Sequence, residues 1–348
     1  MTAFDAQEFL PRAVVDSLTE IRVTDPNRSL KVAMDRERRA SLTNGGKLNI
    51  LAADHTARRV TSSPGNPLGM ADRADLLARI VRVLSSDLVD GVMATMDILE
   101  ELLLLHDVFR KSGRGGFLDG KVMLASLNRG GLAGVSWEMD DPRTGATPQT
   151  CADWRLDGAK LLLRLCDGEP DSLKTMLACA DVVTRMNALG LPTFLEPLPV
   201  TKTESGYKVT RTAEALAKIA GVSSALGDSS RLLWLKLPGC ANFEVVARST
   251  TLPILLLGGE SAGDAAPFLR ELGMAMSSGS NVRGALVGRN VLYPGEGDPL
   301  VVAESAGLII HGGMGVEDAM ERAAITAGGR QGGKGGTEDR AGAGDECG

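Results

Sequence analysis

Residues 231–238 read RLLWLKLP, an apolar run of strand length with one lysine, Lys236, near its end. Apolar residues occupy both alternating faces of this run, as expected of a parallel strand whose sheet is covered by helices. Lys236 interrupts the pattern. Because an unpaired buried charge is costly, this lysine needs either a partner or a function.

Seven other runs of the same kind are spread along the chain, mostly bounded by Gly, Pro, Asp or Asn. They are KLNILAAD (47–54), DGVMATMD (90–97), KVMLASLN (121–128), GAKLLLRL (158–165), LPTFLEPL (191–198), LPILLLGG (252–259) and RGALVGRN (283–290). Amphipathic helical segments lie between them, for example at 70–86, 170–189 and 263–273. Strand–helix alternation indicates parallel pairing through crossover helices. Eight such units predict an α/β fold, a single closed (β/α)8 TIM barrel.

An open doubly wound sheet is the alternative fold. No GxGxxG motif follows the first strand, which weighs against a dinucleotide-binding version of that sheet. We expect an N-terminal helical extension over residues 1–46 and the barrel, as the catalytic domain, over 47–325. The segment 326–348 is rich in Gly and charged residues, which predicts a disordered C-terminal tail.

Composition narrows the class of protein. Apolar residues make up 43% of the chain and aromatics only 3%, so the core must consist of aliphatic side chains. The formal net charge of −6 argues against a general nucleic-acid binder. The five cysteines form no CxxC pair, and no signal peptide or membrane span is recognisable. We therefore expect a cytoplasmic protein with reduced thiols that does not bind a membrane.

Two lysines are predicted to meet inside the barrel. Lys160 lies in the fourth apolar run and Lys236 in the sixth, and alternate strands of a TIM barrel contribute to the same interior layers. Repulsion between two ammonium groups lowers the pKa of one of them, which is a known way to make an amine nucleophilic. The structural alternatives are that Lys236 reaches out to solvent and that Lys160 pairs with a carboxylate.

Two carboxylates are expected near these lysines. Glu196 ends the fifth run, between the two lysine strands, and is suited to proton transfer. Its alternative role is an ion pair with Lys160. Asp54 follows the first run and is expected to hold a substrate hydroxyl or to assist proton transfer. The adjacent His55 is a weaker candidate for substrate contact.

A phosphate site is expected after the last two runs, where this fold frequently binds phosphate. Gly258 and Gly259 end the seventh run, and Gly288 and Arg289 end the eighth. Glycine allows close approach of backbone N–H groups, and arginine forms bidentate contacts with phosphate. Arg164, in the same strand as Lys160, is a second expected anion contact.

Six of these stretches, in the same order, resemble the class I (Schiff-base) aldolases that include tagatose-1,6-bisphosphate aldolase and related bacterial enzymes. They are AADHTARR, DGAKLLLRLCDGEP, FLEPL, LLWLKLPG, PILLLGGE and GALVGRN, within residues 47–292. The resemblance implies that Lys236 carries the imine, that Lys160 and Glu196 assist, and that Asp54 and Arg289 contact the substrate. It implies a sugar-phosphate substrate and no metal or other cofactor.

The sequence departs from this family at two motifs. The first strand carries Asp-His where the sugar-bisphosphate enzymes carry Asp-Gln or Asp-His-Gly, and the seventh ends in Gly-Gly-Glu rather than a Ser-Ala-Gly turn. The match to deoxyribose-phosphate aldolase is poorer, because LKLPGC stands where that enzyme has its lysine motif. Deoxyribose 5-phosphate is therefore only the alternative substrate. The chain also resembles barrel proteins associated with inositol breakdown, which makes a deoxy-keto-gluconate phosphate a candidate.

Two other functions remain open. A metal-dependent barrel lyase would use Asp54, His55 and Glu196 as ligands. A non-catalytic barrel would bind a sugar phosphate as a sensor. Barrels of this kind often associate, so a homo-oligomer is an alternative to a monomer.

Overall fold

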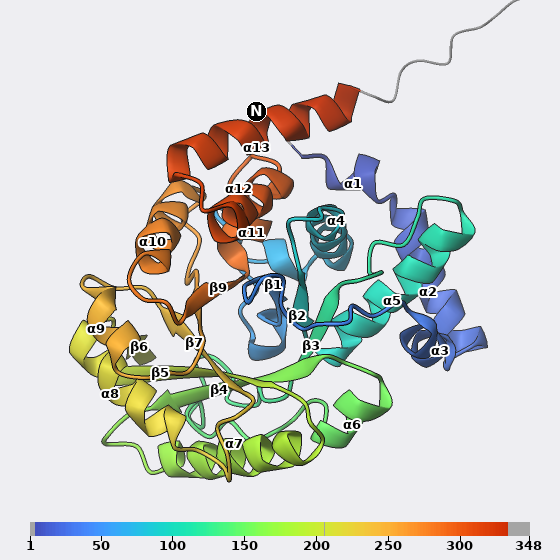
Figure 1. Cartoon of the computed structure of the whole chain (residues 1–348). Helices are drawn as coiled ribbons and strands as arrows, with labels where there is room; N and C mark the ends of the chain where they lie inside the picture. The colour runs from blue at the N-terminus through green and yellow to red at the C-terminus, as the bar shows by residue number, and fades with distance from the viewer. Residues whose placement is uncertain (1–3, 205, 333–348) are drawn as a thin grey trace, which may run out of the picture.

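The computed structural model describes residues 4–204 and 206–332. Eight parallel strands form a closed ring with helices on its outside (Figure 1). The strands are β1 (Leu48–Ala53), β2 (Gly91–Ala94), β3 (Val122–Ser126), β4 (Gly158–Leu165), β5 (Thr193–Thr203), β7 (Leu233–Pro238), β8 (Ile254–Leu257) and β9 (Val282–Val287). Because β9 pairs with β1, the predicted TIM barrel is confirmed and the open-sheet alternative is wrong.

Every second residue of each strand points into the barrel. The lower part of the interior is filled by a separate apolar cluster made of Leu48, Ile50, Ala52, Met93, Val122, Leu124, Phe194, Leu255 and Leu286. The same inward series continues toward the carboxyl ends of the strands with polar residues: Asp54, Ser126, Lys160, Glu196 and Lys236. The barrel therefore has an apolar lower layer and a polar upper layer, and the upper layer lies where TIM barrels hold their active sites.

The helices follow the expected alternation. They are α4 (Arg73–Leu84), α5 (Met96–Lys111), α6 (Pro148–Asp153), α7 (Asp171–Ala188), α8 (Ala213–Ser224), α9 (Phe243–Arg248), α10 (Ala266–Met276), α11 (Arg289–Leu292), α12 (Pro299–Gly312) and α13 (Val316–Gly332), with 3-10 turns η1 (Thr56–Arg58) and η2 (Gly69–Ala71). The expected helix over 70–86 begins three residues later, because the Asp72 carboxylate caps its first turn.

Three short helices precede the barrel: α1 (Ala6–Phe9), α2 (Arg12–Thr24) and α3 (Arg28–Asp35). The chain then reaches the amino ends of the strands. There Arg36 donates to the Asp157 carboxylate at 2.8 Å and to the Lys121 carbonyl at 3.0 Å. Arg38 binds the same carboxylate at 2.7 Å. These contacts fasten the N-terminal segment to the end of the barrel opposite the polar layer.

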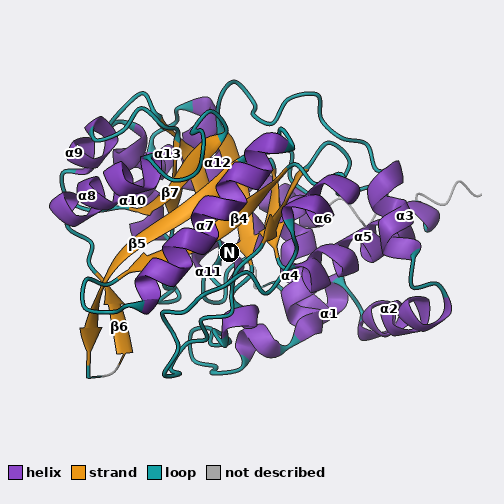
Figure 2. Ribbon diagram, turned by 90° about the horizontal axis from the view of Figure 1, so that it is seen from below, coloured by secondary structure: helices purple, strands orange, loops and turns teal. Residues whose placement is uncertain are grey.

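One element was not expected from the sequence. β5 continues beyond residue 198, where its apolar run ends, and pairs in antiparallel fashion with β6 (Gly206–Val209). The Val200–Val209 and Thr201–Lys208 pairs form this hairpin, which projects past the ends of the other strands (Figure 2). The side chains of both strands alternate, so one face of the hairpin turns toward the barrel mouth.

The last helix extends past residue 325, the expected end of the barrel domain. α13 packs against α12 and continues to Gly332, into the first part of the segment 326–348 that was predicted as a disordered tail. The physical reason is that each added helical residue gains a hydrogen bond on a helix already anchored by tertiary contacts. Residues 333–348 lie outside the described residues. None of the helices in the described part of the chain combines the length and apolar composition needed to cross a bilayer.

Candidate active site

Two buried lysines share one carboxylate oxygen at the centre of the polar layer. The Nζ atom of Lys160 lies 2.8 Å from Oε2 of Glu196, and Nζ of Lys236 lies 2.9 Å from the same atom. Lys160 is fully buried and Lys236 is 6% exposed. The three residues come from neighbouring strands in the order β4, β5 and β7. The predicted approach of the two ammonium groups is thus present, with Glu196 between them.

Asp54 holds Lys160 from the other side. Its Oδ2 atom lies 3.1 Å from Nζ of Lys160 and accepts a hydrogen bond from the Ser126 hydroxyl at 2.7 Å. The Arg129 Nε atom donates to the Asp54 carbonyl at 3.1 Å and lies 3.4 Å from its carboxylate. Lys160 therefore pairs with two carboxylates, whereas Lys236 has one.

The charged groups in this cluster shift one another's pKa values. Burial would raise the pKa of Glu196, but the two ammonium groups outweigh it and lower that pKa to about 2. Burial lowers the pKa of Lys236, and the charge of Lys160 adds to the lowering while Glu196 opposes it. Burial opposes ionisation of Asp54, but Arg129 and Lys160 hold its pKa well below the usual value. Lys236 is thus an amine whose charged form is disfavoured beside an ionised base.

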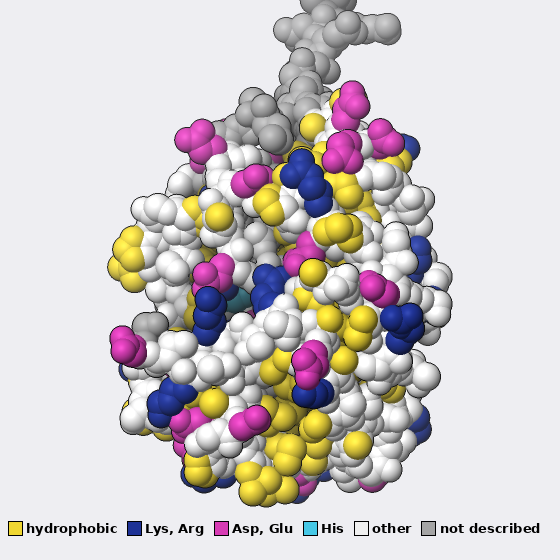
Figure 3. Space-filling view, turned by 90° about the vertical axis from the view of Figure 1, so that its left-hand side faces the viewer, with side chains coloured by type: hydrophobic (Ala, Val, Ile, Leu, Met, Phe, Trp, Pro, Cys, Tyr) yellow, Lys and Arg dark blue, Asp and Glu magenta, His cyan; other side chains and the backbone are white. Residues whose placement is uncertain are grey.

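A cavity of about 790 Å³ opens above this cluster. Lys236, Glu196 and Asp54 line it, whereas Lys160 lies beneath its floor. The remaining predicted site residues also line the cavity; they are His55, Arg164, Gly258, Gly259, Gly288 and Arg289. On the face shown in Figure 3 the surface is hollowed, with Lys and Arg side chains around the hollow. The structure brings all ten predicted residues to one end of the barrel.

The glycine-rich end of the cavity has room for an anion. Gly258 and Gly259 directly follow β8, and Gly288 precedes α11, whose first residue is Arg289. A Cβ atom at Gly288 would lie 2.3 Å from the ring of His55, so only glycine fits there. The Nε atom of Arg289 is buried without a hydrogen-bond partner, and the nearest carboxylate, Glu260, is 3.9 Å away. This end therefore presents a guanidinium with an unpartnered Nε atom and only a weak, exposed ion pair to a ligand.

His55 is held neutral. Burial lowers its pKa to about 3; Asp54 opposes this, and Arg129 and Arg289 add to the lowering. Its Nδ1 atom is buried without a partner. A neutral imidazole at this position can donate a hydrogen bond to a substrate hydroxyl, or accept one from it, without adding charge to the site.

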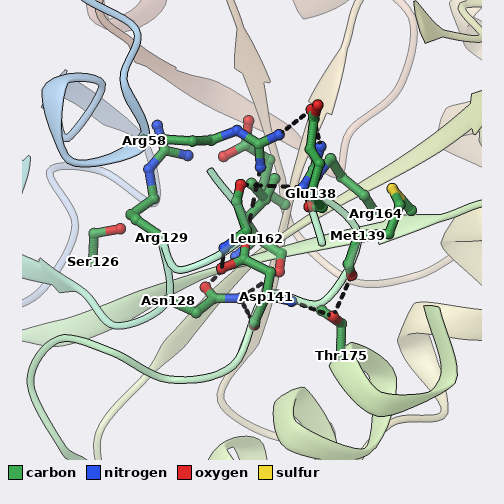
Figure 4. A network of polar contacts seen from close by, with 12 residues as sticks. Arg58, Ser126, Asn128, Arg129, Glu138, Met139, Asp141, Leu162, Arg164 and Thr175 are labelled. Carbon is green, nitrogen blue, oxygen red and sulfur yellow. Dashed lines mark hydrogen bonds and ion pairs between the residues drawn. The ribbon is translucent and has the colours of Figure 1, made fainter. Parts of the chain in front are cut away.

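A group of residues not predicted from the sequence forms the opposite wall (Figure 4). Glu138 accepts from Arg58 at 2.5 Å and from the predicted anion contact Arg164 at 2.7 Å, and all three line the cavity. Arg129 also lines it. A signal for Arg129 existed, because it directly follows the third apolar run, close to the position that Asp54 has at the end of the first. Glu138 lies in a long loop and has no such signal.

The β5–β6 hairpin closes one side of the cavity with Tyr207, Lys208 and Val209, and Arg211, two residues after the hairpin, also lines it. Arg211 is already engaged, because it donates to the Gly239 carbonyl and to Glu271. Across residues 4–204 and 206–332, no group of three or more His, Cys, Asp or Glu side chains is arranged to hold a metal ion. Asp54 and Glu196 are instead occupied by lysine ammonium groups.

The fold and the site together define a TIM barrel with a buried pair of lysines at the carboxyl ends of its strands. The chain belongs to the Cgl0159-like family, which it matches over residues 46–307. The crystal structure of Cgl0159 from Corynebacterium glutamicum (Brevibacterium flavum) is 34% identical, with a TM-score of 0.80 over 87% of this chain and 98% of that one.

Two more distant solved structures share the barrel. A fructose-bisphosphate aldolase from Slackia heliotrinireducens is 15% identical, with a TM-score of 0.60 over 93% of this chain and 96% of that one. An archaeal fructose-1,6-bisphosphate aldolase, solved with its catalytic Lys covalently bound to the carbinolamine intermediate of the substrate, is 17% identical, with a TM-score of 0.54 over 81% and 99%. At these identities the likeness concerns the fold alone. A comparison with curated proteins gives no match.

Proposed function

We propose that this protein is a class I aldolase, an aldehyde-lyase that cleaves a ketose or deoxy-keto sugar-acid phosphate through a Schiff base on Lys236. The observation that carries the proposal is the pair of buried lysines on one Glu196 oxygen, with only Lys236 open to the cavity. An amine beside a second ammonium group and out of water is a favourable nucleophile for a carbonyl.

The reaction begins when the Lys236 ammonium passes a proton to Glu196, 2.9 Å away, and becomes the neutral amine. The amine adds to the substrate ketone and forms a carbinolamine. Loss of water, with one proton supplied by Glu196, yields the iminium. Lys160, held by Asp54 and Glu196, lies beside Lys236 and lowers the pKa of that lysine, which favours the uncharged amine at the start of the cycle.

Carbon–carbon cleavage follows on the iminium. Glu196 removes the proton of the hydroxyl on the carbon β to the imine carbon, the C–C bond breaks, and its electron pair moves to the iminium. An aldehyde leaves, and an enamine of the other fragment, dihydroxyacetone phosphate in this proposal, stays on Lys236. Protonation of the enamine and hydrolysis of the imine restore the amine. The iminium acts as the electron sink, so this sequence requires no metal or organic cofactor.

The remaining residues would bind the substrate. Gly258, Gly259, Gly288 and Arg289 are suited to its phosphate, since backbone N–H groups meet there with a guanidinium whose Nε atom has no hydrogen-bond partner. His55 and Asp54 are placed to contact hydroxyl groups. The covalent lysine intermediate of the archaeal aldolase supports the same chemistry on a related barrel. We propose a cytoplasmic role in carbohydrate or inositol catabolism, as a monomer or homo-oligomer.

Borohydride reduction tests this function. The protein is mixed with a panel of ketose phosphates, a deoxy-keto-gluconate phosphate and deoxyribose 5-phosphate, reduced, digested and examined by mass spectrometry. We expect a stable adduct on Lys236 that is absent in Lys236→Met. In Lys160→Met, trapping at Lys236 should require a higher pH, because the neighbouring charge is gone.

The same experiment separates the rival functions. A metal-dependent lyase would turn substrate over without a trapped adduct and would lose activity on chelation. A sensor would bind sugar phosphates equally well in Lys236→Met and cleave none. An adduct on Lys160 in place of Lys236 would reverse the roles given to the two lysines.

A further inference from the structure

Two arginines at the end of the cavity away from Arg289 have unused hydrogen-bonding capacity. Arg58 and Arg164 both donate to Oε1 of Glu138, and they are only 7% and 6% exposed. The Nη1 atom of Arg58 faces Oδ2 of Asp141 at 3.8 Å, beyond hydrogen-bond distance, and both this atom and the Nε atom of Arg164 are buried without a hydrogen-bond partner. Because a buried unpaired donor is costly, these atoms point to a ligand that the site is built to receive.

The charge balance of the cavity supports the same conclusion. Apart from the reactive Lys236, the charged side chains around it comprise five cations and four carboxylates, namely Arg58, Arg129, Arg164, Arg289 and Lys160 against Asp54, Glu138, Asp141 and Glu196. Arg289 faces the same cavity, and its nearest carboxylate, that of Glu260, is 90% exposed. The cavity therefore carries more positive than negative charge. An anionic ligand would restore the balance.

The strand order sets where these groups lie relative to Lys236. In the ring, β4 and β9 are four strands apart in either direction, so they stand opposite each other, and β7 lies midway between them. Arg164 is on β4, Arg289 directly follows β9, and Lys236 is on β7. Arg58 joins Arg164 through their shared contact with Glu138. A ketone above Lys236 would therefore have a cationic group on each side.

We propose that Arg58 and Arg164 form a second anion subsite, so that the substrate is an open-chain ketose with a phosphate near Arg289 and another anionic group, phosphate or carboxylate, at its far end. This assignment of the two ends rests on the proposed function, whereas anion binding at Arg58 and Arg164 does not. The cavity of about 790 Å³ is large enough for a six-carbon chain with two anionic groups.

Three probes that differ at the far end test this subsite. They are fructose 1-phosphate, fructose 1,6-bisphosphate, and the open-chain keto acid of equal length with a phosphate beside its ketone and a carboxylate at the other end. Binding is measured by calorimetry and, separately, by borohydride trapping. We expect at least one two-ended probe to bind the unaltered protein about tenfold or more tightly than fructose 1-phosphate, as one charge-assisted contact provides. The tighter of the two identifies phosphate or carboxylate as the preferred group.

Arg58→Gln is the test variant, because Glu138 keeps its contact with Arg164 and the fold retains that ion pair. It should bind fructose 1-phosphate as the unaltered protein does and lose the preference for the two-ended probe. Arg58→Lys should recover only part of the preference, because the lysine ammonium lacks the planar guanidinium that binds an anion with two parallel N–H groups. Arg211→Gln is the matched control, a cation at the cavity rim already engaged by Glu271, and it should keep the preference.

The subsite is overturned if the three probes bind the unaltered protein equally, or if Arg58→Gln weakens all of them by the same factor. It is also overturned if Arg211→Gln abolishes the preference as Arg58→Gln does, because long-range charge would then explain the result. A preference that depends on Arg58 without any adduct on Lys236 would uphold the subsite and refute the aldolase proposal.

Discussion

Glu196 is the residue on which the lysine pair depends. Two ammonium groups this close repel each other, and a single carboxylate oxygen bound to both offsets that repulsion. Lys160 retains Asp54 if Glu196 is neutralised, whereas Lys236 retains no carboxylate. The two lysines thus differ in their carboxylate partners. Lys236, which lines the cavity, depends on Glu196 alone.

Glu196→Gln should lower turnover by about 10²- to 10⁴-fold, the usual contribution of a positioned acid–base group. It should also lower the free energy of unfolding by about 3 kcal/mol, because a buried ion pair is broken on one side. Steady-state kinetics and urea unfolding measure the two effects. Glu214→Gln, in an exposed pair with Lys218, is the control and should change neither. Wild-type turnover in Glu196→Gln would contradict its role.

His55 predicts a pH dependence of stability. Its pKa is about 3 in the folded protein, mainly because of burial, and 6.5 when unperturbed. Below pH 6.5 the unfolded chain therefore binds a proton that the folded chain excludes, so stability present at neutral pH is lost as the pH falls from 6.5 toward 3. His55→Gln should show a shallower loss between pH 6.5 and 5.

The expected difference in slope is at most ~1.4 kcal/mol per pH unit, measured by urea unfolding at pH 7, 6 and 5. The window stops at pH 5 because carboxylates with lowered pKa values, such as Glu196, add their own loss at lower pH. The lowered pKa of His106, caused mainly by burial, acts equally in both proteins and cancels in the comparison. Parallel curves would show that His55 does not contribute.

At the scale of elements, the junction of β9 and α11 is the most constrained part of the site. An added Cβ at Gly288 would lie 2.3 Å from the His55 ring and 2.5 Å from the Ala52 carbonyl oxygen. Ala52 belongs to β1, so a change at this junction also affects the neighbouring strand. The same junction presents Arg289 to the cavity.

Gly288→Ala should cost about 1–3 kcal/mol of stability, because the ring or the strand must move. It should also remove the stabilisation that inorganic phosphate gives the unaltered protein in a thermal melt. Gly297→Ala is the matched control, since a Cβ there meets nothing within 4 Å. An unchanged melting temperature and an unchanged phosphate effect in Gly288→Ala would show that the junction has more room than the structure indicates.

At the scale of the whole molecule, the two ends of the barrel have separate tasks. The cavity lies at the carboxyl ends of the strands, whereas the contacts of Arg36 and Arg38 with Asp157 close the amino ends. This division is common in TIM barrels, where one end carries activity and the other stability. A change at the amino ends should therefore alter stability alone.

Arg36→Met should lower the free energy of unfolding by about 3 kcal/mol, because the Asp157 carboxylate loses its buried cation and keeps the half-buried Arg38 and the Met123 backbone N–H. The borohydride adduct on Lys236 should form at the same rate per folded molecule. Arg12→Met, which removes a pair exposed on both sides, should have almost no effect on stability. A lost adduct in folded Arg36→Met would show that the two ends are coupled.

Much of the barrel could be read from local patterns. Each of the eight apolar runs forms a strand. A parallel strand that is buried on both faces must be apolar along its length, so it can be recognised from its own segment alone. The period of two also directs Lys160, Glu196 and Lys236 inward on successive barrel strands. Their meeting at one carboxylate follows from periodicity and strand order together.

Other features depended on contacts between distant segments. Glu138 reaches Arg58 and Arg164 from a loop without a periodic pattern, and the β5–β6 hairpin has a polar composition that resembles any surface loop. α13 extends past residue 326 to Gly332, and its packing against α12 is a contact that the composition of this segment does not reveal. The alternation of residues along each strand determines which side chains face the barrel interior. The ion-pair partner of each buried charge depends on how the loops fold over the barrel mouth. Those loops belong to segments far apart in the chain, so no local pattern reveals the partners.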